Sequence, residues 1–168
     1  MPATTQITDK IISDAIVASL RNVFWTMLQQ MPSLEAPASA AIQGEDDGKF
    51  EVIGSVGFAG EVSGTVYLCL TEEFARLSTA HVLGMTPAEV AFSGSDLVKD
   101  AIGEVTNMTA GGFKNELCDL GLPCKLGLPT ILRGHSLAVA SSKSITRHLF
   151  WFQCSGHRLA ANILIRND

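Results

Sequence analysis

Residues 95–119 read SDLVKDAIGEVTNMTAGGFKNELCD and predict a long amphipathic helix. Ser93 or Ser95 can cap its beginning, and Gly121 can end it. At 100° per residue, its apolar and small residues gather on one side. This side is the predicted core face: Leu97, Val98, Ala101, Val105, Met108 and Gly112.

Four residues form a stripe along one edge of this helix: Asp100, Glu104, Asn107 and Gly111. Residues three or four apart are neighbours on a helix surface. A glycine inside a helix costs about 1 kcal/mol relative to alanine, so its presence there needs a reason. The stripe predicts a docking edge that displays short polar groups. The alternative is a solvated helix face without a function.

Periodicity predicts the other elements. We expect a first long helix over residues 7–31, an exposed loop over 32–48, a helix from Thr71 to Gly84, and a short one after the Thr86-Pro87-Ala88-Glu89 capping box. The predicted strands are 50–58, 62–70, 128–133, 136–141, 145–154 and 157–166, the last two joined by Ser155-Gly156. This order predicts a two-layer α+β fold, with a mainly antiparallel sheet packed against two long helices. We expect one domain, residues 1–168.

The composition limits the possible partners. The 168 residues are 46% hydrophobic and only 17% charged, which suggests that a second copy covers part of the surface. The net charge is -5 and no basic stripe occurs, which argues against nucleic acid and anionic membranes. The N-terminus lacks a signal-peptide pattern, and uninterrupted apolar runs are short. We therefore expect a cytoplasmic homodimer.

The cysteines and histidines predict no metal site. No C-x-x-C pair occurs, and we expect four reduced, mostly buried thiols: Cys69, Cys118, Cys124 and Cys154. Cys118 and Cys124, six positions apart, can be loop neighbours. His148 and His157 lie on opposite strands of the last hairpin and can approach each other, but we expect histidines that face solvent or have partners. The chain has neither a nucleophile elbow nor a P-loop.

The wording around the stripe resembles a known family. The segment DAIGEVTN, residues 100–107, is similar to the signature of the CheC/CheX/FliY chemotaxis phosphatases. That signature has Asp or Ser, three residues, Glu, two residues and Asn on a long helix, with a proline farther along, here Pro129. CheC carries two copies of the motif and this chain carries one, so it resembles CheX. The recognisable wording covers residues 95–130.

The resemblance implies a specific activity. The substrate would be a phosphorylated CheY-like receiver domain, a response regulator that carries its phosphate on an aspartate and binds Mg²⁺ itself. Asn107 would orient the attacking water, and Glu104 would pair with a lysine of the regulator. Asp100 and Gly111 would be partner contacts, and this chain would bind no cofactor of its own.

Two other functions stay open. The chain can be a non-catalytic module that binds a receiver, or a flagellar or signalling partner, without hydrolysis. It can also be a purely structural dimerisation domain. Substitutions at Glu104 and Asn107 would then be silent.

Overall fold

The computed structural model describes residues 6–35, 49–94 and 96–167. Its helices are α1 (Asp9–Leu28), α2 (Glu72–Leu83), α3 (Pro87–Phe92) and α4 (Asp96–Asp119). Its strands are β1 (Ser33–Leu34), β2 (Phe50–Gly60), β3 (Gly64–Leu70), β4 (Cys124–Leu126), β5 (Thr130–Leu137), β6 (Ile145–Cys154) and β7 (His157–Arg166).

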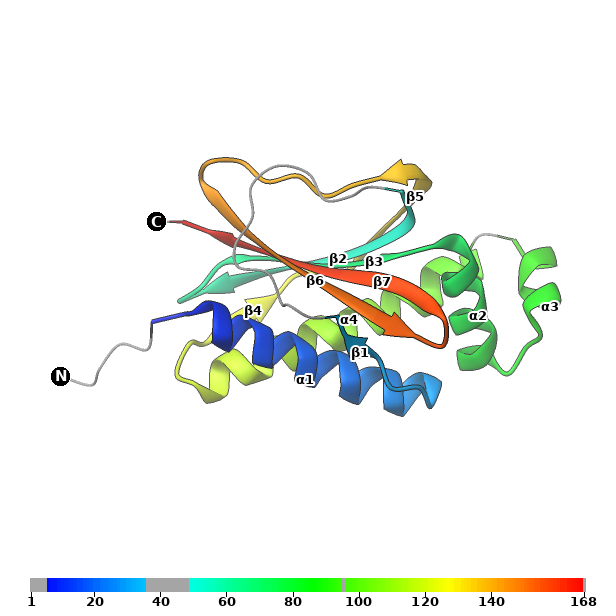
Figure 1. Cartoon of the computed structure of the whole chain (residues 1–168), viewed down its shortest axis with the longest axis horizontal. Helices are drawn as coiled ribbons and strands as arrows, with labels where there is room; N and C mark the ends of the chain where they lie inside the picture. Colours follow the sequence, from blue (N-terminus) through cyan, green and yellow to red (C-terminus); the bar gives the residue numbers. More distant parts are fainter. Residues whose placement is uncertain (1–5, 36–48, 95, 168) are drawn as a thin grey trace.

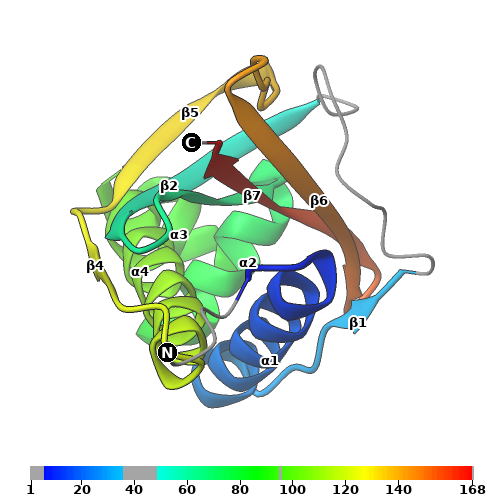
Figure 2. The same ribbon diagram turned by 90° about the vertical axis from the view of Figure 1, so that its left-hand side faces the viewer.

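The strands form one sheet with the order β1-β6-β7-β3-β2-β4, and β5 also pairs with β2. Every strand pair in the described part of the chain is antiparallel. Helices α1 and α4 lie side by side on one face of this sheet (Figures 1 and 2). The predicted two-layer α+β fold is confirmed.

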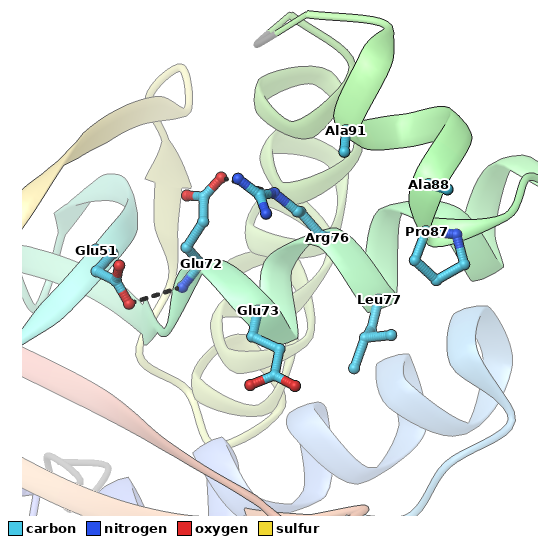
Figure 3. A pocket seen from close by; sticks show the side chains of 8 residues that line it. All are labelled: Glu51, Glu72, Glu73, Arg76, Leu77, Pro87, Ala88 and Ala91. Atoms are coloured by element: carbon cyan, nitrogen blue, oxygen red, sulfur yellow. Dashed lines mark hydrogen bonds and ion pairs between the residues drawn. The ribbon is translucent and has the colours of Figure 1, made fainter.

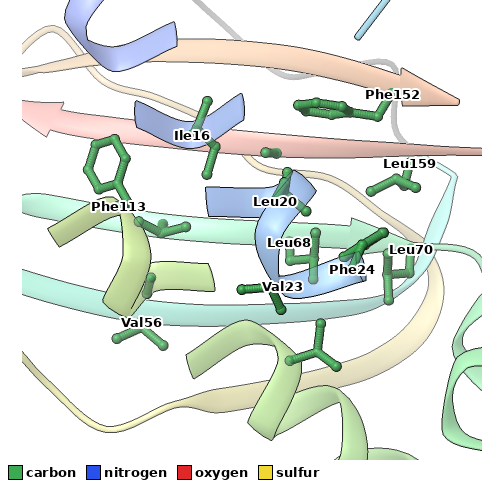
Figure 4. Packing of buried hydrophobic residues seen from close by; sticks show 14 of the residues in the cluster. Ile16, Leu20, Val23, Phe24, Val56, Leu68, Leu70, Phe113, Phe152 and Leu159 are labelled. Atoms are coloured by element: carbon green, nitrogen blue, oxygen red, sulfur yellow. The ribbon is translucent and has the colours of Figure 1, made fainter. Parts of the chain in front are cut away.

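The main core fills the space between these two helices and the sheet. This core includes Ile16 and Leu20 of α1, Leu68 of β3 and Phe152 of β6 (Figure 4). Phe113 of α4 packs on Phe58 of β2, with 5.6 Å between ring centroids. Burying a side chain of this size contributes about 1.5–3 kcal/mol. The helices are therefore held mainly by their apolar faces.

A second, smaller apolar cluster lies on the other face of the sheet. It contains Phe50 and Ile53 of β2 and Leu149 of β6, and Val139 from the β5–β6 connection joins it. The ring of Phe50 stacks on Trp151, with 5.6 Å between ring centroids. The Leu149–Phe152 run thus supplies both clusters, since alternate residues of a strand face opposite sides.

Two glycines let α4 lie close to its neighbours. A side chain at Gly54 of β2 would overlap Thr106 of α4, and one at Gly112 would overlap Ser19 of α1. Next to that second crossing, the Ser19 hydroxyl donates to the carbonyl of Thr109 at 2.6 Å. These close contacts fix α4 against both the sheet and α1.

Helix α1 is shorter than the predicted 7–31. Thr8 caps it by accepting a hydrogen bond from the Ile11 N–H, and Gln29 ends it in the left-handed conformation (φ 50°). Helix α1 is long and apolar enough to cross a membrane, judged by length and composition alone. The uninterrupted apolar runs in the sequence, on which the prediction rested, are all shorter. Eight of its residues are buried: Ile12, Ala15, Ile16, Ser19, Leu20, Val23, Phe24 and Leu28.

Three strand predictions were wrong in detail. Within the predicted loop, Ser33 and Leu34 form β1 on the edge of β6, while residues 36–48 lie outside the described part of the chain. Strand β4 was not predicted; it pairs with the end of β2. Strand β5 joins most of the predicted strand 128–133 to the first two residues of the predicted strand 136–141, and residues 138–141 lie outside it.

His148 and His157 do not approach each other. In the β6–β7 hairpin His157 stands opposite Cys154, whereas His148 stands opposite Ile163. The His157 ring packs on Phe74 with 5.3 Å between centroids. His148 is buried, with its Nδ1 3.3 Å from Oδ1 of Asp9. The two rings therefore lie at positions six residues apart along the paired strands.

Candidate functional site on helix α4

The four stripe residues lie together on the outer edge of α4. Asp100 and Glu104 are exposed, whereas Asn107 and Gly111 are half-buried. The buried face of the helix is centred on Ile102, Thr106, Thr109 and Phe113, about a quarter turn from the predicted core face. The stripe therefore stands nearly opposite the buried face, rather than beside it as predicted.

Two threonines explain this difference. The Thr106 hydroxyl donates to the Ile102 carbonyl at 2.6 Å, and the Thr109 hydroxyl donates to the Val105 carbonyl at 2.8 Å. A hydroxyl bonded to the preceding turn can be buried without an unsatisfied polar group. Threonine counts as a polar residue in hydrophobic periodicity, so the predicted core face lay too close to the stripe.

Strands β4 and β5 lie beside α4, and β4 reaches the stripe at Gly111. A Cβ at Gly103 would lie 3.8 Å from Cγ1 of Ile131, and one at Gly111 would lie 3.9 Å from Cδ1 of Leu126. Pro129 is exposed in the connection before β5, two residues from Ile131. The proline of the predicted signature therefore follows the strand beside the helix.

The polar groups of the stripe are available to a partner. Within residues 6–35, 49–94 and 96–167, no hydrogen bond or ion pair involves the side chains of Asp100, Glu104 or Asn107. Asn107 can both donate and accept, and Glu104, one turn earlier, can accept from a cation. The edge thus offers a neutral amide next to two carboxylates.

The stripe extends farther along α4 than predicted. Lys114 and Cys118 continue it with the same spacing of three and four, and both are half-buried. Two apolar side chains close to α4 in sequence are also strongly exposed: Phe92 at 91% and Leu128 at 88%. The heptad spacing could have revealed the first pair, whereas the exposure of the second pair depends on the fold.

A separate open pocket of about 610 Å³ lies between α2 and α3 (Figure 3). Glu72 lines it and pairs with Arg76 and Arg133. The backbone N–H of Glu72 donates to Oε1 of Glu51 at 3.2 Å. None of the four stripe residues lines this pocket. In the described ranges, no three His, Cys, Asp or Glu side chains are grouped so that they could hold a metal ion.

The chain shares its fold with several solved structures. The chain is similar to CheX from Vibrio vulnificus (21% identity, TM-score 0.78, 96% of this chain and 100% of that chain). CheX from Desulfovibrio desulfuricans has 21% identity and a TM-score of 0.73, over 92% of this chain and 99% of that chain. A chain in the CheX-CheY-BeF3-Mg²⁺ complex from Borrelia burgdorferi has 20% identity and a TM-score of 0.67, over 93% and 98%.

A match to a sequence family identifies the chain more specifically than its fold does. Among the curated proteins, none matches the chain. Residues 52–153 match the family described as "Chemotaxis phosphatase CheX". This match covers β2 through most of β6, including the whole of α4 and its stripe. The chain therefore belongs to the CheX family of chemotaxis phosphatases.

Proposed function

We propose that the chain hydrolyses the aspartyl phosphate of a CheY-like receiver domain, with Glu104 and Asn107 as its working pair. The observation that carries this proposal is their position, one turn apart on the outer edge of α4 and without partners in the described chain. Membership of the CheX family supports phosphatase activity. The Borrelia burgdorferi complex of CheX with CheY supports a receiver as the partner.

The chemistry requires no nucleophile from α4. Hydrolysis forms a bond between a water oxygen and phosphorus and breaks the bond between phosphorus and the aspartate oxygen. The products are inorganic phosphate and a free aspartate carboxylate. Phosphoryl transfer depends mainly on positioning and charge stabilisation. Asn107 can hold the water in line, because a carboxamide donates and accepts without adding negative charge beside the phosphate.

The remaining stripe residues would set the register of docking. Glu104 would pair with a lysine of the regulator, and the regulator would supply the Mg²⁺ that neutralises the phosphoryl charge. Asp100 lies one turn before Glu104, and Gly111 lies one turn after Asn107. Both would contact the rim of the receiver. Gly111 presents no side chain, so a partner backbone can come close to α4 there.

The proposal also covers the oligomeric state and the cellular location of the protein. We infer a homodimer, because only 17% of the residues are charged and large apolar side chains such as Leu128 and Leu132 are exposed. We infer action in the cytoplasm, where a receiver substrate would be found. No nucleic acid or membrane partner is needed for this activity.

Loss of phosphate from a receiver tests the function directly. CheY-like receivers of the host cell would be phosphorylated with a small-molecule phosphodonor, and their decay followed with and without the protein. We expect the natural protein to accelerate decay and Asn107→Ala to lose this acceleration by about 10²-fold. Asn115→Ala is the matched control, since Asn115 is an exposed asparagine of the same helix.

The outcomes separate the candidate functions. If Asn107→Ala binds the receiver normally but no longer accelerates decay, the water-positioning role is supported. If the natural protein binds receivers but leaves their decay unchanged, the chain is a docking module. If Asn107→Ala and Asn115→Ala are equally active, Asn107 has no catalytic role.

A further inference from the structure

Two thiols meet at the C-terminal end of α4. Cys118 lies in the last turn of the helix, and Cys124 begins β4 after the chain has reversed its direction. The reversal is hydrogen-bonded: the Gly121 N–H donates to the Cys118 carbonyl at 3.0 Å, and the Leu122 N–H donates to the Leu117 carbonyl at 2.9 Å. Gly121 adopts a φ of 82°. This turn brings the two cysteines back toward each other.

The strand and the helix present these cysteines to one another. Leu126 faces α4, with its Cδ1 3.9 Å from the Cβ position of Gly111. Cys124, two residues earlier in β4, points to the same side of the strand. Cys118 lies seven residues after Gly111, on the same edge of the helix. The two side chains are accordingly close enough for Cys118 to influence the pKa of the Cys124 thiol.

The environments of the two thiols differ. Cys124 is buried, with 6% of its surface exposed, whereas Cys118 is half-buried and can be reached by a small solute. Burial raises the pKa of the Cys124 thiol, the adjacent Cys118 raises this pKa further, and the Lys114 ammonium acts in the opposite direction. Cys118 would therefore meet an oxidant first, and Cys124 would react second.

We propose that Cys118 and Cys124 form a peroxide-reactive dithiol that closes to an intrachain disulfide. The Cys118 sulfur attacks one oxygen of hydrogen peroxide, which gives a sulfenic acid and one water. The Cys124 sulfur then attacks the sulfenic sulfur, and the S–S bond forms as a second water leaves. Overall, the two thiols lose two protons and two electrons, and one peroxide takes them up to give two waters.

The bridge would tie β4 to the end of the helix that carries the stripe. Cys118 is on the same edge as Asn107, three helical turns farther on, and Leu126 of β4 contacts that edge at Gly111. The proposal does not depend on the phosphatase function. It concerns the chemistry of two side chains and has its own readout.

Peptide mapping of the oxidised natural protein tests this inference. Cleavage after Lys114 and Lys125 releases one peptide that contains both cysteines. The folded protein would be treated with a modest excess of hydrogen peroxide, quenched, denatured, alkylated and digested. We expect this peptide to escape alkylation, to be lighter by two hydrogen atoms, and to recover both alkylation sites after dithiothreitol treatment. The peptides of buried Cys69 and Cys154 should stay fully alkylated and serve as internal controls.

A single substitution supplies the second control. In Cys118→Ser the same peptide should carry one alkyl group at Cys124, before and after mild peroxide treatment. The inference would be overturned if the natural protein kept two alkylated cysteines in this peptide under conditions that oxidise free cysteine. It would also be overturned if Cys118 went on to sulfinic acid while Cys124 stayed a thiol.

Discussion

In the proposed function, Glu104 and Asn107 would have different tasks, because their side chains differ in charge. A carboxylate gains from pairing with a cation, so Glu104 is suited to holding a partner in register. A carboxamide is neutral, so Asn107 can stand beside a phosphoryl group without repelling it. Binding and chemistry should therefore separate when the two residues are changed one at a time.

Glu104→Gln should weaken receiver binding while leaving the rate at saturating receiver close to natural. A hydrogen bond to a charged group contributes about 1.5–3 kcal/mol, so the dissociation constant should rise by roughly 10- to 100-fold. Titration calorimetry at low and at high salt would measure this loss of affinity, which should be smaller at high salt. Glu116→Gln, an exposed change on the same helix, is the control, and an equal effect of both would disprove the pairing.

The sequence was enough to predict that the four stripe residues share one helix edge, but not the direction in which this edge faces. The spacing of Asp100, Glu104, Asn107 and Gly111 is enough to place them on one edge of a helix. Which way this edge faces depends on the neighbours of the helix. Thr106 and Thr109 are buried because their hydroxyls bond within the helix and Gly54 and Ser19 leave room for close packing. None of these contacts is visible as periodicity.

Among the elements, α4 is held by close packing that tolerates little added volume. Gly112→Ala should lower the free energy of unfolding by about 1–3 kcal/mol, because the new methyl group would overlap Ser19. The adjacent Gly111→Ala should raise it by up to about 1 kcal/mol, because its Cβ would make an ordinary contact with Leu126. Urea denaturation of both variants checks this. Equal effects would mean that the α1–α4 crossing can adjust.

The strands that the sequence missed are too short or too irregular for a periodic signal. Strand β1 has two residues and β4 has three, so neither repeats an alternation. The predicted break between residues 133 and 136 corresponds to an irregularity inside β5. There the pairing with β2 shifts register, and Ser136 has a φ of 52°. A bulge of this kind resembles a strand end in sequence, although the strand continues.

The pH dependence of the whole molecule should depend on His148. Burial lowers the pKa of His148 below its ordinary value of 6.5, and the facing Asp9 carboxylate opposes this only in part. The unfolded chain therefore binds the proton more readily. Stability from the neutral ring is present above about pH 6.5 and should be lost as pH falls below it.

Urea denaturation from about pH 7.5 to about pH 5.5 would measure this loss. In His148→Gln, the slope of the free energy of unfolding against pH should be flatter over this range. His135→Gln, a change at an exposed histidine, is the control. An unchanged slope in His148→Gln would show that another group binds the proton.

Assembly is the second property of the whole molecule. Strand β5 pairs with β2 and leaves its other edge open in the described part of the chain, and Leu132 on β5 is 55% exposed. An open edge with an apolar side chain favours association. We expect sedimentation velocity to show a dimer, and Leu132→Glu to shift it toward the monomer. A natural protein that sediments as a monomer at every concentration would contradict the homodimer proposal.

The place of β7 in the sheet determines when the fold can close during synthesis. Strand β7 lies between β6 and β3, so it joins the β2–β3 hairpin to the β6–β1 side of the sheet. Its pairing with β3 links residues 64–69 to residues 160–165. A ribosome must therefore deliver nearly all the described residues before the two halves of the sheet can meet. Until then, the apolar edge of β3 stays open, and a nascent chain stopped at Gly156 would be a client for chaperones.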